Sequence, residues 1–110
     1  MPETVLTTKP PHQRLPYATL PEIRAAIERR RLIRFHYKGR EVVLEPHLLG
    51  KAFRTAAFYL KCFNPSDGQW SYHGFCEIRG FEELKDTFPF RGDVWDQERK
   101  IVELDTQARW

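Results

Sequence analysis

The spacing of apolar residues predicts a helix near the start of the chain. Between residues 19 and 31, apolar side chains recur at steps of three and four, which places them on one face of a helix. Thr19 followed by Glu22 has the form of a capping box, and Pro21 is compatible with a first turn. We therefore predict a helix that begins after Thr19 and ends near Arg31. Its apolar positions are Leu20, Ile23, Ala26 and Ile27.

After this helix the apolar pattern changes to a period of two, which is typical of half-buried strands. Residues 33–37 alternate between apolar and polar side chains, and Lys38-Gly39 predicts a turn. A second strand is expected over residues 40–49. Pro46 cannot donate a ladder hydrogen bond, so it indicates an edge, a bulge or the end of that strand.

Two aromatic-rich segments follow, separated by a run of turn-forming residues. Residues 57–63 and 70–78 are predicted strands, and residues 64–68 are all turn formers. Residues 81–84 fit either a helical turn or a fifth strand, and residues 101–104 fit a short strand or a helix. This order indicates an α+β fold, with an N-terminal helix packed on a small antiparallel SH3/Sm-like β-barrel.

The predicted elements divide the chain into three parts. Residues 1–18 contain four prolines and little apolar periodicity, so we expect a flexible arm. Residues 19–92 hold the helix and the strands of the barrel. Residues 93–110 are expected to form a C-terminal extension that packs on it. A chain of 110 residues is long enough for one such domain.

Four ordered motifs within residues 20–90 resemble the WYL domain family, a small bacterial barrel named after a Trp-Tyr-Leu signature. The run Phe58-Tyr59-Leu60 is similar to that signature, with Phe in place of Trp. The other three motifs cover residues 23–39, 43–50 and 70–82.

The resemblance implies a function as well as a fold. WYL domains are usually attached to transcription regulators and sense ligands there, so a ligand-sensing module is expected. Those regulators usually carry arginines for anionic ligands in the strand that follows the signature. This chain has Ser71, Gly74 and Glu77 at the corresponding positions.

Charge is distributed unevenly along the chain, whose net charge is +3. Residues 1–60 hold 11 Lys/Arg and 5 Asp/Glu, a balance of +6, whereas residues 61–110 hold 7 and 10, a balance of −3. This asymmetry suits a basic face for an anionic partner, and equally an ordinary solvated surface. The run Arg29-Arg30-Arg31 either binds phosphates or is a solvated helix end.

Few residues are candidates for chemistry. Glu45 and His47 share a strand face, where the carboxylate can orient the imidazole, or where His47 bonds to backbone or solvent. Cys62 and Cys76 lie too far apart across the predicted hairpin for a disulfide, and with His73 they lack the spacing of a zinc site. We interpret both thiols as reduced and mostly buried, and expect no metal.

The strand at residues 57–63 is apolar on both faces, which raises the question of what covers the second one. Tyr59, Lys61 and Phe63 lie together on one of these faces. They are covered by the protein itself, with Trp95 and Trp110 as candidate lids, or they form a platform on which bases stack.

We expect a binding protein and not an enzyme, because no set of residues supports a reaction. The expected ligand is a nucleotide, an oligonucleotide or another anion, and the expected role is in transcription regulation. The alternative is a module for homo-oligomerisation or for binding a regulatory protein. No cofactor and no membrane is expected, and without about 18 successive apolar residues or a secretory signal the expected location is the cytoplasm. The expected ligand contacts are Tyr37, His47, Arg54, Tyr59, Lys61 and Arg79.

Overall fold

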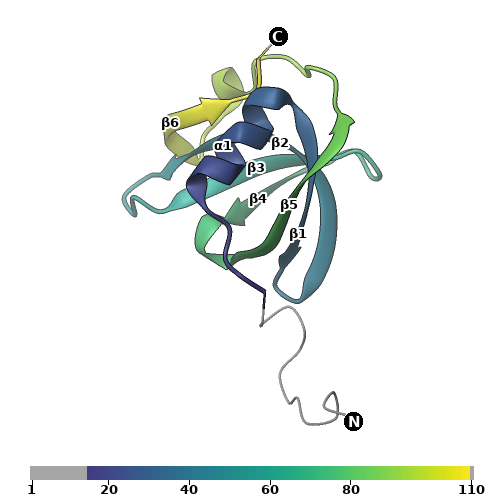
Figure 1. Ribbon diagram of the computed structural model, residues 1–110. Coiled ribbons are helices and arrows are strands. Elements are labelled where there is room, and N and C mark those ends of the chain that lie inside the picture. The colour runs from purple at the N-terminus through teal and green to yellow at the C-terminus, as the bar shows by residue number, and fades with distance from the viewer. Residues whose placement is uncertain (1–14, 110) are drawn as a thin grey trace, which may run out of the picture.

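The computed structural model describes residues 15–109, which form one α-helix, six strands and two short 3₁₀-helices (Figure 1). The predicted α+β class, a helix followed by antiparallel strands, is confirmed. No helix in this part of the chain has the length and apolar character needed to cross a membrane. The elements are α1 (Leu20–Arg29), β1 (Arg31–Tyr37), β2 (Arg40–Ala52), β3 (Phe58–Asn64), β4 (Gln69–Gly74), η3 (Phe75–Glu77), β5 (Ile78–Thr87), η4 (Val94–Gln97) and β6 (Ile101–Gln107).

Helix α1 begins as predicted and ends slightly earlier. The backbone N–H of Glu22 donates to Thr19 Oγ1 at 3.4 Å, and Thr19 N–H donates to Glu22 Oε1 at 2.9 Å, so the capping box is confirmed. Arg30 adopts the left-handed conformation (φ 52°) and caps the last turn. The predicted end near Arg31 is therefore two residues too late.

The six strands form an antiparallel sheet in the order β4-β3-β2-β1-β5, and β6 also pairs with β2. Strand β2 extends to Ala52, three residues beyond the prediction, because its second half gains β6 as a partner. Its register with β3 shifts between Pro46 and Leu48. Of the three interpretations that Pro46 left open, the bulge is the one observed.

The strand predicted over residues 70–78 is divided in two. Strand β4 ends at Gly74, the three residues of η3 follow, and β5 then runs from Ile78 to Thr87. Residues 81–84 are therefore strand and not a helical turn. Aromatic residues continue on both sides of this break, so in the sequence Gly74 is the only residue that marks the end of β4. Within the described chain, β4 and β5 are not paired with each other, and the sheet is not closed.

The main core lies between α1 and one face of the sheet. Helix α1 packs on β1, β2, β5 and β6, and its buried residues face the sheet (Figure 1). Leu48, which lies opposite Lys61 in β3, is buried outside this core cluster. The largest core side chains are Ile23, Ile27, Ile33, Phe35, Leu49, Leu60 and Ile78.

The two ends of the described chain are both held to the sheet. The expected flexible arm lies outside the described residues up to position 14, but residues 15–18 run beside β5. Ala18 N–H donates to the Ile78 carbonyl at 3.0 Å, and Gly80 N–H donates to the Pro16 carbonyl at 2.9 Å. The C-terminal segment joins the sheet through β6, so it is part of the sheet as well as packed on it.

Candidate functional site

The side of β3 and β4 that faces away from the core carries a continuous group of aromatic side chains. Leu60 and Cys62 are buried in the core, so the alternate residues of β3 point to the opposite side. On that side the register places Lys61 beside Tyr72 and Phe63 beside Trp70. We call this surface the outer aromatic face. Its aromatic residues are Tyr59, Phe63, Trp70 and Tyr72.

Residues of the C-terminal segment place cations against these rings. The Arg91 guanidinium carbon lies 4.1 Å from the centre of the Phe63 ring. Lys100 Nζ lies 4.7 Å from the centre of the Tyr59 ring. Both distances are within the range of cation–π attraction. The outer aromatic face is therefore covered in part by charged side chains, and not by an apolar lid.

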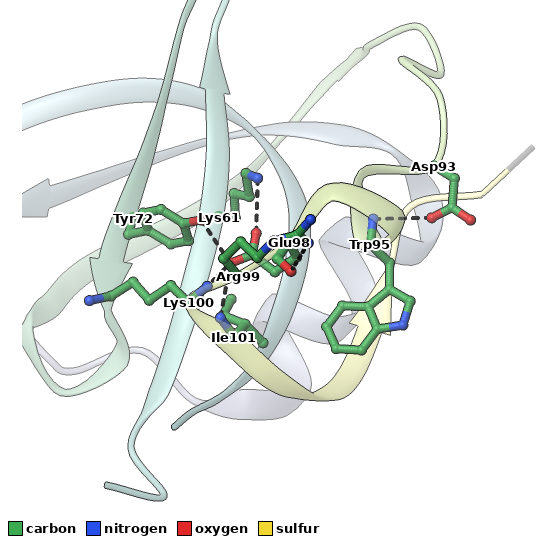
Figure 2. Close-up of polar contacts among 8 residues, drawn as sticks. All are labelled: Lys61, Tyr72, Asp93, Trp95, Glu98, Arg99, Lys100 and Ile101. Atoms are coloured by element: carbon green, nitrogen blue, oxygen red, sulfur yellow. Dashed lines mark hydrogen bonds and ion pairs between the residues drawn. The ribbon is translucent and has the colours of Figure 1, made fainter. Parts of the chain in front are cut away.

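Glu98 is a buried carboxylate that ties the C-terminal segment to this face (Figure 2). Its Oε1 accepts a hydrogen bond from Lys61 Nζ at 2.9 Å, and its Oε2 accepts one from the Tyr72 hydroxyl at 2.7 Å. The backbone N–H groups of Lys100 and Ile101 donate to the same Oε2 at 2.8 and 2.9 Å. The carboxylate, whose side chain is 0% exposed, thus has four donors in place of water.

These contacts determine the protonation states at the centre of the face. Burial by itself would raise the pKa of Glu98, but the Ile101 amide, Lys61 and Tyr72 outweigh it and hold that pKa below the ordinary value. Burial, reinforced by the hydrogen bond to Glu98, raises the pKa of Tyr72 to about 12. At neutral pH Glu98 is therefore ionised, and the Tyr72 hydroxyl donates its proton to the hydrogen bond with Glu98. The positive charge of Lys61 is balanced by the negative charge of Glu98.

A second buried carboxylate, Glu45, holds Arg91 in place. Arg91 donates from Nε to Glu45 Oε1 at 2.6 Å and from Nη2 to Glu45 Oε2 at 2.9 Å, a bidentate pair of the strong, directional kind. His47 Nε2 lies 2.9 Å from the same Oε1. Arg91 and His47 together outweigh the effect of burial and lower the pKa of Glu45. The guanidinium is therefore fixed in orientation by Glu45.

His47 itself is enclosed and neutral. Its side chain is 1% exposed, and its ring packs 5.0 Å from Trp70 and 4.6 Å from Phe88 between centres. Burial lowers its pKa and outweighs the opposing effect of Glu45. Since Glu45 is ionised and can only accept, neutral His47 carries its proton on Nε2, and this N–H donates the hydrogen bond to Glu45. Of the two alternatives for His47, the pairing with Glu45 is the one observed, and Trp70 and Phe88 pack against its ring.

The structure brings together three of the six expected ligand contacts. Tyr59 and Lys61 lie on the outer aromatic face, and His47 lies beneath Trp70. Arg54 lies in the loop between β2 and β3, with its guanidinium carbon 5.0 Å from the centre of the Phe53 ring.

The other two expected contacts lie at the far ends of β1 and β5. The Tyr37 hydroxyl accepts from Gly74 N–H at 3.1 Å and donates to Glu77 at 3.3 Å. Arg79 donates to the Leu15 carbonyl and to the Tyr17 hydroxyl. Both side chains hold neighbouring segments together, which is a structural role.

Sequence reasoning missed several residues that complete the face. An alternating pattern at residues 70–72 could have placed Trp70 and Tyr72 beside Lys61. No local pattern connects Lys61 with Glu98 or Glu45 with Arg91, because these partners are 37 and 46 residues apart. Of the candidate lids, Trp95 lies apart from Tyr72 in Figure 2, with Glu98 and Arg99 between them, and Trp110 lies outside the described residues.

Several arginines in and just after α1 are paired with carboxylates of the second half of the chain. Arg29 Nη1 lies 2.8 Å from Glu83, and Arg34 Nη2 lies 3.1 Å from Glu82, both in β5. Arg24 forms a further pair with Asp105 of β6 at 2.8 Å. Cations of the basic first half of the sequence therefore pair with carboxylates of the acidic second half within one domain.

The cysteines differ from each other in their surroundings. Cys62 is buried in the core, and burial raises the pKa of its thiol well above the ordinary value. Cys76 is exposed, so the prediction that both thiols are mostly buried is wrong for this one, because the strand ends at Gly74 and Cys76 lies in η3. Neither is in a disulfide. Residues 15–109 contain no cluster of three His, Cys, Asp or Glu side chains arranged for a metal.

No protein-family model, curated protein or solved structure matches the chain. The resemblance to WYL domains therefore remains a prediction from the sequence.

Proposed function

We propose that the protein binds a nucleotide or a short single-stranded oligonucleotide on the outer aromatic face, as a WYL-like sensing module linked to transcription regulation. The observation that carries the proposal is the setting of Trp70. Its side chain is 39% exposed, and it lies beside Phe63, whose other neighbour is the fixed guanidinium of Arg91. An exposed indole next to a preoriented cation suits a base and its phosphate.

The cations available to a phosphate are Arg91 and Lys100. Arg91 uses Nε and Nη2 on Glu45, and within the described chain its Nη1 has no hydrogen-bond partner. Lys100 is exposed and forms no ion pair with the residues that the structure describes. Lys61, in contrast, is committed to Glu98. Two phosphate contacts predict a modest slope of about −1.4 for log K against log salt on a single strand.

The proposal includes the finer assignment of the fold. A helix before the sheet, the strand order β4-β3-β2-β1-β5 and the bulge in the long β2 support an SH3/Sm-like barrel that stays open between β4 and β5. In such a barrel the outer aromatic face lies on the convex side of β3 and β4, where a ligand can reach it.

The test is the anisotropy of a labelled oligonucleotide, with oligo-dT, oligo-rU and unlabelled mononucleotides as competitors. Trp70→Ala is expected to weaken binding by about 5- to 150-fold, the loss of one stacked base. Arg91→Gln and Lys100→Gln are each expected to reduce the salt slope by about 0.7. The matched control is Tyr17→Ala, at an aromatic residue that is 57% exposed. The Arg79 guanidinium lies over the Tyr17 ring, so this control also combines an exposed ring with a cation, but beside β5.

Two results would refute the proposal. One is no binding of any of these nucleic acids at about 50 mM salt. The other is a Trp70→Ala variant that binds as tightly as the Tyr17→Ala control.

A further inference from the structure

The two end strands of the sheet differ in how their free edges are protected. Strand β5 carries five charged side chains, and residues 16–18 hydrogen-bond along its first residues. Strand β4, with the sequence Gln-Trp-Ser-Tyr-His-Gly, has no Lys, Arg, Asp, Glu or Pro. Its six pairs with β3 show no bulge. Charge, proline, bulges and cover are the devices that normally keep a strand edge from pairing, and β4 has none of the first three.

The backbone groups on the free edge of β4 can be identified from Gly74. In an antiparallel strand, the N–H and C=O of one residue point to the same edge, and those of the next residue point to the other. Gly74 N–H donates to the Tyr37 hydroxyl and not to β3. Trp70 and Tyr72 are four and two residues before Gly74, so their N–H and C=O groups point to the same free edge. Within the described chain they face no other strand.

We propose that β4 pairs antiparallel with β4 of a second copy of this chain, about a two-fold axis at Ser71. This register sets Trp70 opposite Tyr72 of the partner subunit, and the reverse. In this symmetric register, the N–H and C=O groups of Trp70 and Tyr72 in one copy bond to those of Tyr72 and Trp70 in the other. All four free groups of each copy are used, and the two strands share four hydrogen bonds. One residue of slip would turn the aromatic side chains to opposite faces.

Side chains and charge fit the same arrangement. Trp70 and Tyr72 both lie on the outer aromatic face, so the register forms two Trp–Tyr cross-strand pairs, which stabilise antiparallel strands. Because β4 is uncharged, its self-pairing brings no like charges together, which is what an isologous contact requires. One strand pair buries less than the standard interface, so the dimer is weak and depends on concentration.

Sedimentation velocity without nucleotide, from about 5 µM to about 500 µM, tests the proposal. The expected result is a shift in mass from 13.1 kDa toward twice that value. Trp70→Pro removes one edge N–H at a position where an edge strand tolerates proline, and it should abolish the shift. Trp70→Phe keeps the N–H and an aromatic ring, and it should retain the dimer.

Amide hydrogen exchange of the unaltered protein decides the matter if Trp70→Pro does not fold. The Trp70 and Tyr72 amides should exchange more slowly at high than at low concentration, while the Glu82 amide in β5 should not change. A mass that stays at 13.1 kDa with no such protection overturns the proposal, as does a dimer that persists in a folded Trp70→Pro variant. A chain that stays monomeric in these experiments can still bind an oligonucleotide, so a failure of the dimer proposal does not decide the proposed function.

Discussion

The two faces of the β3–β4 hairpin show two different ways of covering a sheet. The inner face is buried under α1 by aliphatic side chains, and Leu60 and Cys62 there are 0% exposed. The outer face is aromatic and is covered by the charged segment that contains Arg91, Glu98 and Lys100. The inner face is thus enclosed by apolar packing, whereas the outer face is covered only in part, by charged side chains.

The difference teaches where stability and specificity reside. Apolar burial is non-directional and scales with area, at about 25 cal/mol per Å², so the inner face tolerates exchange between residues of similar shape. A buried carboxylate is stable only while its donors remain in place. The outer face therefore holds the C-terminal segment in one position, and it also presents Trp70 and Arg91 to solvent in a defined geometry.

The largest expected effect is on the inner face. Phe35→Ala should reduce the free energy of unfolding by about 3–5 kcal/mol, because this ring is 0% exposed and its removal leaves a cavity beside His73. Urea denaturation gives the value. Val43→Ala, at a residue of β2 that is 40% exposed, is the control and should change it by well under about 1 kcal/mol. Equal losses in the two variants would contradict the assigned core.

A somewhat smaller effect is expected from the outer face. Glu98→Ala should reduce the free energy of unfolding by about 2–4 kcal/mol, because Lys61 and the Tyr72 hydroxyl lose a buried partner. Glu103→Ala, at an exposed residue of β6, is the control and should change it by less than about 0.5 kcal/mol.

A double-mutant cycle shows whether the loss comes from the ion pair. Lys61→Met in the Glu98→Gln background should recover part of the lost stability, since replacing both charges is milder than removing one. Strict additivity of the two changes would indicate that Lys61 and Glu98 are not coupled.

The smallest expected effect concerns a buried side-chain nitrogen on the inner face. His73 Nδ1 is buried without a hydrogen-bond partner, while Nε2 contacts Ser71 Oγ at 2.8 Å. Burial, with a smaller effect of Lys38, lowers the pKa of His73 to about 4, whereas an unfolded histidine titrates near about 6.5. Between these values only the unfolded state takes up the proton, so stability falls as the pH falls.

The measurement is the free energy of unfolding of wild type and His73→Leu at about pH 7.5 and about pH 5. Wild type should lose about 2 kcal/mol more than the variant over this interval. His36→Leu, at a histidine that lies outside the core cluster, should leave the loss unchanged. An identical loss in wild type and His73→Leu would exclude His73 as its source.

Local signals in the sequence were sufficient for most of the secondary structure. Thr19 with Glu22 determines where α1 begins, and the alternation over residues 33–37 determines a strand and its buried side. Residues 58–63 are apolar on both faces, so the sequence predicted the strand but not which side is buried. The break at Gly74 and the extension of β2 to Ala52 were missed. Both depend on which strand lies alongside, and periodicity within one segment carries no information about its neighbours.

The sequence by itself determined where the helix begins and where most of the strands lie. These features depend on residues close together in the chain or on apolar periodicity. Only the tertiary structure decided that Arg91, Glu98 and Lys100 cover part of the outer aromatic face, and that cations of the first half pair with carboxylates of the second. The physical reason is that ion pairs and cation–π contacts act over a few ångströms in space, and they leave no periodic trace when their partners are some 40 residues apart.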